Sequence, residues 1–249
     1  MTPPTEREQP FAVREKGVMV FPEIKALNIK GFLADAESAQ LYKRASLAAK
    51  RGPCLEIGSY CGLSTAYLGT GCREAGGVLF SIDHHGGSEE QQPGQAYFDP
   101  DLVNPSTGEI DTFPHFRRTL RSLDLENTVI PIAARSELVA RHWSTPLSLV
   151  FIDGGHTFQT ALTDYVCWSP HLMPGGYLLI HDIFPDPSQG GQAPFCIYRL
   201  ALASGLYEDC GIVGTLAILQ RPLGKDLTAA AISQWQALQA AGTAKASDH

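Results

Sequence analysis

The sequence predicts a doubly wound α/β domain, in which helices cover both faces of a mostly parallel sheet. Three observations lead to this prediction. Short apolar runs recur along the chain without polar alternation, which is typical of strands buried on both faces. Amphipathic stretches with a helical period lie between these runs. Glycines follow several of the runs, where a buried strand turns into the next helix.

Five apolar runs predict the strands of this sheet. They are CLEIGS (54–59), VLFSIDHH (78–85), TVIPIAA (128–134), LSLVFIDGG (147–155) and GGYLLIHDIF (175–184). Helices are expected between them at 37–50 before the first run, then at 64–75, 116–123 and 158–172. A last run, GIVGTLAILQR (211–221), predicts an edge strand or a hairpin.

The chain length of 249 residues permits one large domain or two small ones, and we expect one main domain at 36–222. Residues 1–35 are expected to form an extension that is helical beyond its polar start. Residues 223–249 are expected to form a C-terminal helix and a disordered tail. Two long loops, an insert at 84–114 and a second loop at 185–195, are expected to face each other across a pocket.

Composition limits the classes of partner. The 19 Lys and Arg residues against 26 Asp and Glu give a formal net charge of −7. This balance argues against a large basic nucleic-acid surface and against tethering to an anionic membrane. No apolar run approaches the roughly 18 residues that cross a bilayer, and the N-terminus lacks the pattern of a secretion signal. We therefore expect a cytoplasmic protein whose six cysteines stay reduced.

A glycine turn after the first strand predicts a nucleotide site. Gly58 and Gly62 allow the chain to turn tightly and a ligand to approach the backbone. Asp83 ends the second strand, where a carboxylate accepts hydrogen bonds from both ribose hydroxyls of a nucleoside. Both features lie where doubly wound sheets bind ligands. The alternative to a nucleotide site is that the two glycines simply end the strand and that Glu56 caps a helix.

The same turn favours S-adenosylmethionine over a dinucleotide. The pattern G-x-G-x-x-G is absent, and Glu56 directly precedes the turn. A pyrophosphate needs backbone N–H groups and a helix N-terminus rather than a nearby carboxylate. The amino group and the sulfonium of S-adenosylmethionine gain from such a carboxylate. An NAD-dependent oxidoreductase on the same scaffold stays open as the alternative from another class.

Four motifs carry a family resemblance: LEIGSYCGLST, SIDHH, VFIDGGHTF and MPGGYLLIHD. Together they resemble class I S-adenosylmethionine-dependent methyltransferases, in the small-molecule branch of bacterial sugar and antibiotic O-methyltransferases and catechol O-methyltransferase. The resemblance covers about residues 35–220. It implies a seven-stranded sheet, a homodimer, and transfer of a methyl group by in-line displacement to a small molecule, first of all to a hydroxyl oxygen. N- or S-methylation and a non-catalytic binding module remain alternatives.

The resemblance also implies a cofactor site at the ends of four strands. Its residues would be Glu56, Gly58, Ser59, Tyr60, Gly62, Ser64, Asp83, Arg135, Ser136 and Asp153. Glu56 would bind the methionyl or ribose side, Tyr60 and Ser64 the methionine moiety, and Asp83 the ribose. The turn after the third strand would contact adenine. The aspartate that ends the fourth strand would face the sulfonium.

His156 is the candidate general base, with Asp153 beside it. A hydroxyl acceptor must be aligned with the methyl group and must lose its proton. By the resemblance, His156 stands where catechol O-methyltransferase has its catalytic lysine, and an imidazole titrates near neutral pH. The alternative is that His156 caps the helix that starts at Thr157 or makes local hydrogen bonds.

Asp153 and Asp182 are the candidate metal ligands. The resemblance implies that metal-dependent relatives bind magnesium through the fourth-strand aspartate and an acid–amide pair after the fifth strand. Here the third position is Ile183, which offers no oxygen, whereas magnesium prefers octahedral oxygen ligands. His156 and His181 beside the two aspartates would suit a transition metal. The sequence leaves a magnesium site open and favours no metal, with Asp182 as a structural acceptor.

Overall fold

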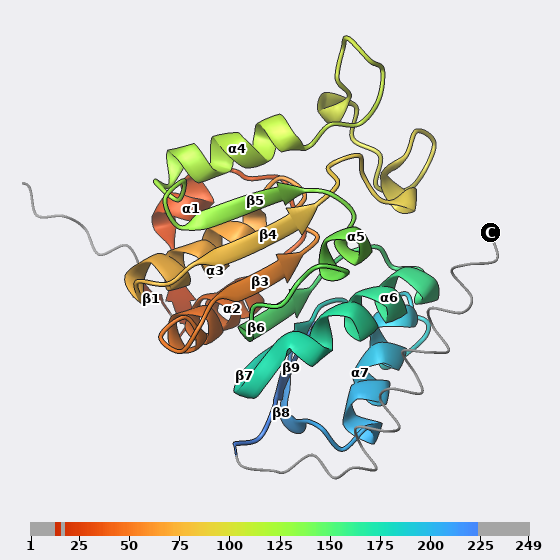
Figure 1. The fold of residues 1–249 in the computed structure, drawn as a ribbon. Coiled ribbons are helices and arrows are strands. Elements are labelled where there is room, and N and C mark those ends of the chain that lie inside the picture. Colours follow the sequence, from red (N-terminus) through yellow and green to blue (C-terminus); the bar gives the residue numbers. More distant parts are fainter. Residues whose placement is uncertain (1–12, 16–17, 224–249) are drawn as a thin grey trace, which may run out of the picture.

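The computed structural model describes residues 13–15 and 18–223, in which a seven-stranded sheet lies between two layers of helices (Figure 1). The strand order is β5-β4-β3-β6-β7-β9-β8. The strands are β3 (Cys54–Ile57), β4 (Leu79–Asp83), β5 (Val129–Ala133), β6 (Leu147–Ile152), β7 (Leu172–Ile180), β8 (Glu208–Val213) and β9 (Leu216–Gln220). Strands β3 to β7 are parallel, and β9 runs antiparallel to both β7 and β8. The predicted fold class is confirmed.

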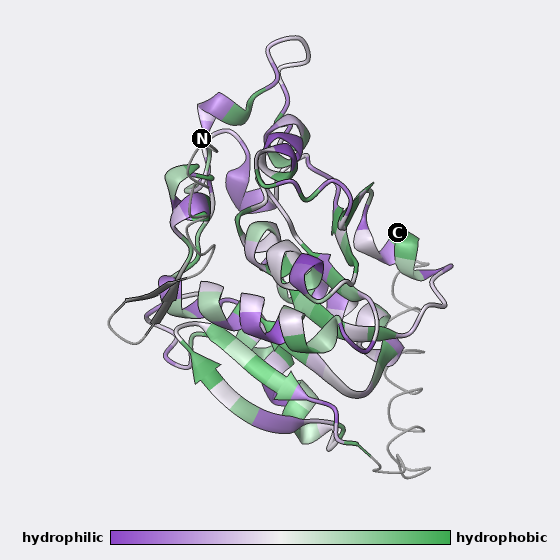
Figure 2. Ribbon diagram, turned by 90° about the vertical axis from the view of Figure 1, so that its left-hand side faces the viewer, coloured by the Kyte–Doolittle hydropathy of each residue, from purple (hydrophilic) through white to green (hydrophobic). Residues whose placement is uncertain are grey.

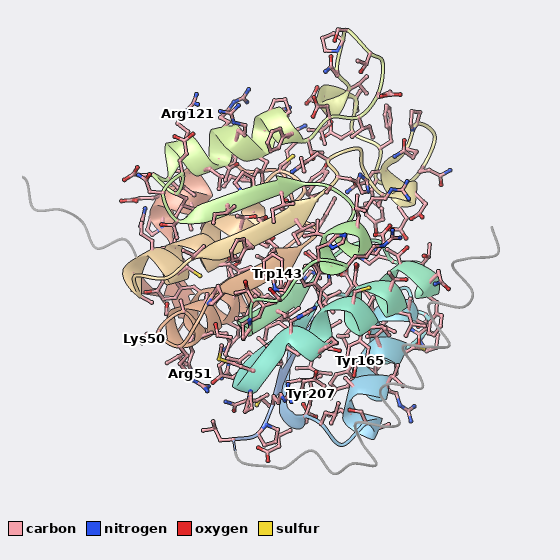
Figure 3. All side chains as sticks on the ribbon, viewed as in Figure 1. Lys50, Arg51, Arg121, Trp143, Tyr165 and Tyr207 are labelled. Atoms are coloured by element: carbon pink, nitrogen blue, oxygen red, sulfur yellow. The ribbon has the colours of Figure 1, made fainter. Side chains whose placement is uncertain are left out.

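Two apolar layers hold helices on opposite faces of the sheet. The helices are α2 (Asp35–Ala48), α3 (Leu63–Glu74) and α4 (Phe113–Ser122) on one face, and α5 (Ser136–Ala140), α6 (Phe158–Trp168) and α7 (Ala193–Ala203) on the other. Successive side chains of β3 serve both layers, because Cys54 packs in the first and Leu55 in the second. Tyr165 and Tyr207, labelled in Figure 3, belong to the second layer.

Helix α4 shows the one-sided burial that its sequence predicts. In α4, Phe116 and Leu120 are buried, whereas Arg117, Arg118 and Arg121 are exposed. Figure 2 shows purple and green alternating along the helices, and Figure 3 shows Arg121 on the outer side of α4. These arginines form a solvated face, as expected. No helix of the described residues is long and apolar enough to cross a membrane.

Several predicted boundaries move. The insert expected at 84–114 ends at residue 112, because α4 starts at Phe113 with a proline in its first turn. Before α4, the insert holds two short 3₁₀ turns, η1 (Glu89–Gln91) and η2 (Pro100–Leu102). The last apolar run forms the hairpin β8–β9. Helix α7 begins inside the loop expected at 185–195.

The N-terminal extension is mostly not helical where the structure describes it. Strands β1 (Val13–Glu15) and β2 (Val18–Val20) form an antiparallel pair, and only α1 (Pro22–Ala26) is helical. The sequence is rich in valine at 13–20, and β-branched residues favour strands, so the expectation of a helical extension is wrong there. The helix and tail expected at 223–249 lie, except for residue 223, outside the described residues.

The turn after β3 predicts a large effect of one methyl group. Gly58 adopts a φ of +86°, and a Cβ there would stand 2.1 Å from the Asp153 carbonyl oxygen. We expect Gly58→Ala to lower the free energy of unfolding by about 3 kcal/mol or more, because neither backbone can retreat without disturbing the β3–β6 pairing. At roughly 2–4 °C per kcal/mol for a chain of this size, calorimetry should show a fall of at least about 6 °C in Tm.

Gly191→Ala is the matched control, since a Cβ at Gly191 meets nothing within 4 Å and its φ is not positive. Its Tm should stay close to that of the wild type. A Gly58→Ala variant that melts with the wild type would contradict the close approach of the two backbones.

Candidate functional site

A cavity of about 560 Å³ lies at the carboxyl ends of the parallel strands. Residues that follow five strands contribute to its wall: Gly58, His84, Ala134, Asp153 and His181. The insert adds Gly87, Ser88, Glu89, Gln91 and Gln92. The cavity lies at the switch point of the sheet, where the strand order reverses between β3 and β6, and doubly wound sheets bind ligands there.

Asp83 fixes the glycine turn and also lines the cavity. Its Oδ2 accepts hydrogen bonds from the backbone N–H groups of Ser59 (3.0 Å) and Tyr60 (2.8 Å), and its Oδ1 accepts one from His85 N–H (2.7 Å). An ionised carboxylate offers about four lone-pair sites, so a ligand hydroxyl can still bind. The backbone contacts explain why the turn holds Tyr60 at a φ of +47°.

Glu56 has a different place from the one the sequence predicts. It is completely buried and is not part of the cavity wall. Its carboxylate accepts hydrogen bonds from Ser64 Oγ (2.6 Å), Thr65 Oγ1 (2.5 Å) and Ser81 Oγ (2.7 Å). Burial raises the pKa of Glu56 to about 7, although the three hydroxyls oppose that shift. In this structure Glu56 supports the turn from behind, and its direct contact with a cofactor stays a prediction.

The other residues of the turn divide between support and cavity wall. Gly62 caps α3 with a φ of +91°, and a Cβ there would press on Phe116, so it shapes the turn without lining the cavity. Ser59, Tyr60 and Ser64 line the cavity, but the Ser64 hydroxyl is committed to Glu56. The Ser59 hydroxyl is buried and has no hydrogen-bond partner among the described residues, which leaves it available to a ligand.

The predicted adenine turn reaches the cavity together with a residue that the sequence analysis missed. Arg135 and Ser136 line the wall after β5, with Arg135 exposed and Ser136 buried. The Ser136 hydroxyl donates to the carboxylate of Asp164, a buried residue of α6 that also lines the cavity. The sequence analysis did not single out Asp164, because this residue lies in a stretch whose pattern is explained by a helix alone.

A buried imidazole joins the carboxylates at the end of the cavity formed by β6 and β7. His181 Nδ1 lies 3.1 Å from Asp153 Oδ1 and 3.5 Å from Asp182 Oδ1, and its Nε2 lies 3.3 Å from Glu37 Oε2. Burial alone would lower the pKa of His181, but the facing carboxylates, Asp153 first, hold it far above its usual value. His181 is therefore an imidazolium. Glu37, which comes from α2, was missed by the sequence analysis.

His156 also carries a proton in this arrangement. Its Nε2 lies 2.7 Å from Asp182 Oδ2, and its Nδ1 lies 3.1 Å from Glu90 Oε2 of the insert. Asp182 above all raises the pKa of His156 to about 9. A general base at this position would first have to lose that proton, and the role expected of His156 stays a prediction. The alternative of a helix cap is wrong, because the Thr157 side chain caps α6.

The candidate metal ligands, Asp153 and Asp182, lie beside His181 in this arrangement. Asp153, His181 and Asp182 each offer one atom within 4.8 Å of the others. Magnesium requires oxygen ligands, and both nitrogens of His181 already face carboxylates, so Nδ1 presents a proton rather than a lone pair. The residue beside the two aspartates is His181 and not Ile183, which is buried in the apolar core. We derive no step through a metal.

An unexpected segment completes the mouth of the cavity. Residues 30–33 line it, and Lys30 Nζ binds Asp99 Oδ2 (2.5 Å) and Asp101 Oδ2 (3.0 Å) of the insert. The rings of Phe32 and Tyr97 pack edge to face with centroids 5.3 Å apart. The loop at 185–195 contributes no residue to this wall, so its expected position across the pocket is wrong. The side-chain amide of Gln192 anchors this loop by donating a hydrogen bond to the backbone carbonyl oxygen of Phe184.

Comparison with known proteins identifies one family. A family model described as a methyltransferase domain matches residues 55–183. Similar solved structures include an SAH-bound Podospora anserina methyltransferase (TM-score 0.58, 13% identity) and a Bacillus cereus O-methyltransferase in complex with SAH (0.53, 15%). A third is the Streptomyces achromogenes O-methyltransferase TomG in complex with SAM (0.54, 13%). Each match covers 80% of this chain and 86% of the other. At these identities the structures share the fold.

The buried carboxyl of Glu56 should make stability depend on pH. Because its pKa in the fold is about 7 and its ordinary value is 4.5, its stabilising contribution is full below about pH 4.5 and is lost as the pH rises through 7. The variant Glu56→Gln keeps the shape of the side chain but replaces the titrating carboxyl group with an amide. Urea denaturation from pH 5 to 8 should show a flatter decline of the free energy of unfolding in this variant than in the wild type.

Glu126→Gln is the control, because Glu126 is exposed in the turn before β5. Its stability curve should run parallel to that of the wild type. If Glu56→Gln gave the same parallel curve, the buried carboxyl would not be the group that titrates.

Proposed function

Because the chain belongs to the methyltransferase domain family, we propose that it transfers a methyl group from S-adenosylmethionine to a hydroxyl oxygen of a small molecule. One observation carries this proposal. The glycine turn, fixed by Asp83, and the cluster around Asp153 line one cavity at the carboxyl ends of the strands. This cavity is large enough for a nucleoside and an acceptor together. Three proteins with similar folds bind SAH or SAM.

We assign the cofactor contacts to residues of the cavity wall. Asp83 would hold the ribose with its remaining lone pair, and Ser59 and Tyr60 would face the methionine moiety. The turn at Arg135 and Ser136 would contact the adenine. Glu56, Gly58, Gly62 and Ser64 would act through the shape of the turn, since their polar or backbone groups are committed within the fold.

The reacting end is assigned to Asp153, His156 and Asp182. When bound, S-adenosylmethionine supplies an electrophilic methyl group for in-line displacement by the acceptor oxygen. His156 would take the proton of the acceptor hydroxyl once it has lost its own, and Asp182 would orient the ring. Asp153 would place its negative charge near the sulfonium. The insert, linked to His156 through Glu90, would exclude water during the transfer.

The charge on His156 favours a second candidate, methylation of nitrogen or sulfur, at neutral pH. A thiolate or an unprotonated amine needs less help from a base than a hydroxyl does. The alternative of an NAD-dependent oxidoreductase gains no such support. The carboxylate of Asp83 already accepts hydrogen bonds from the backbone N–H groups of the glycine turn, which a pyrophosphate would need. A homodimer, a cytoplasmic location and a catalytic domain bounded by 36–222 are further proposals that rest on the sequence.

Calorimetric titration with S-adenosylhomocysteine tests the cofactor assignment. We expect micromolar binding, no measurable heat with NAD, and equal affinity in EDTA and in magnesium chloride, because His181 presents no free lone pair. Asp83→Ala should lose at least about tenfold in affinity, equivalent to about 1.4 kcal/mol. Glu126→Ala, outside the cavity, should bind like the wild type. Preference for NAD would overturn the proposal.

The pH dependence of kcat/KM tests His156, using the first phenol or sugar that gives methyl transfer in a screen. Since only the neutral ring accepts a proton, the rate should rise about tenfold per pH unit and level off near pH 9, the pKa of His156. His156→Gln should remove this rise and lower the rate by roughly 10²-fold or more. A wild-type rate that is already constant at pH 7 would favour N- or S-methylation or another base.

A further inference from the structure

Glu37 is a buried carboxylate that the proposed mechanism does not use. It lies in the first turn of α2, and only 4% of its surface is exposed. Its Oε2 accepts a hydrogen bond from the Ala34 N–H group (2.8 Å), a contact that is common at helix starts. Its Oε1 accepts two more, from the backbone N–H (2.6 Å) and the hydroxyl (3.0 Å) of Thr215, between β8 and β9. Capping of α2 explains the first contact but not the other two.

The same carboxylate faces the imidazole of His181. Its Oε2 lies 3.3 Å from His181 Nε2, and the Thr215 hydroxyl lies 3.4 Å from that nitrogen. The other ring nitrogen, Nδ1, lies 3.1 Å from Asp153 Oδ1. The ring is therefore held from both sides, by α2 and the hairpin on one side and by the end of β6 on the other. Rotation of this buried ring would leave polar groups without partners, which is unfavourable in the interior.

Asp153 depends on this ring for its orientation. Among the residues that the structure describes, His181 is the one that forms a hydrogen bond with the Asp153 side chain. That carboxylate lines the cavity, and its side chain is 21% exposed. The direction of its charge is therefore set by His181, and the place of His181 is set in turn by Glu37.

We propose that Glu37 is a positioning residue for methyl transfer, which fixes the Asp153 carboxylate at the reacting end of the cavity through His181. The inference rests on the proposed function, which assigns Asp153 to the sulfonium. A carboxylate near the sulfonium stabilises the charged cofactor but gives little to the neutral thioether of S-adenosylhomocysteine. The position of Asp153 therefore affects both the preference for S-adenosylmethionine and the alignment of its methyl group.

Glu37→Asp tests this inference, because it keeps the negative charge on a side chain too short to reach both Thr215 and His181. Calorimetry should show a ratio of S-adenosylmethionine to S-adenosylhomocysteine affinity at least about threefold lower than in the wild type. With an acceptor from the screen, kcat should fall about tenfold or more, while the KM of the acceptor stays within about threefold. An unchanged affinity ratio in a folded Glu37→Asp would overturn the inference.

Ser38→Ala is the matched control for a merely structural role. Ser38 is the buried neighbour of Glu37, and its hydroxyl donates to Ala34 O (3.0 Å) without a contact to His181 among the described residues. Its loss should lower the Tm, because the start of α2 loses a hydrogen bond. The affinity ratio and kcat should stay as in the wild type, whereas a fall in both would assign the effect of Glu37 to the helix start.

A crystal structure of Glu37→Gln provides an arm that needs no ligand. This variant keeps the volume of the side chain but has one acceptor oxygen in place of two. We expect His181 Nδ1 and Asp153 Oδ1 to separate by about 0.5 Å or more beyond their present distance, which is the tolerance within which catalytic groups have to be held. Unchanged positions of both side chains would overturn the inference even if Glu37→Asp failed to fold.

The outcomes separate this inference from the proposed function. If the wild type binds neither S-adenosylmethionine nor S-adenosylhomocysteine, the proposed function fails and this inference fails with it. If the wild type binds both and Glu37→Asp keeps the wild-type ratio, only the role of Glu37 is overturned. A lower ratio in Glu37→Asp together with a wild-type ratio in Ser38→Ala supports positioning of Asp153 through His181.

Discussion

Three hydroxyl groups that donate to the buried carboxylate of Glu56 hold the first turn of α3 against the central strands. Ser64 and Thr65 come from α3, and Ser81 comes from β4. The glycine turn lies between these anchors, and Asp83 fixes it from the side of the cavity through two backbone N–H groups. The backbone that lines the cavity thus depends on a carboxylate that is not part of the cavity wall. A network of this kind is rigid only while every member is satisfied.

Charge balance organises the opposite end of the cavity. Two protonated imidazoles, His156 and His181, lie among carboxylates of α2, the insert and the ends of β6 and β7. Each imidazole bridges elements that the chain order separates, so a change at one carboxylate alters the proton affinity of several groups. The surplus of negative charge explains why the proposed base has a high pKa.

The sequence was sufficient for features that depend on local pattern. Apolar runs predicted the five parallel strands, and the position of Asp83 at a strand end predicted its place in the cavity. Features that depend on long-range contacts were not predictable in this way. The raised pKa of His156 comes first from Asp182 and then from Glu90 of the insert, both distant in the chain. Nothing near Glu56 in the chain reveals that Ser81 would donate to its carboxylate. Glu37 and Asp164 look like ordinary helix residues until the fold brings Glu37 to His181 and Asp164 to the cavity wall.

The contact between Lys30 and the insert also bears on the order in which the molecule assembles. Lys30 and Asp99 are 69 positions apart, so their contact closes a long loop and should follow formation of the sheet. Such surface ion pairs contribute only about 0–1 kcal/mol each. The mouth of the cavity should therefore be among the last parts to form and among the first to open in native-state hydrogen exchange, while the strands beneath it stay closed. Entry and release of ligands can then proceed without any loss of the core.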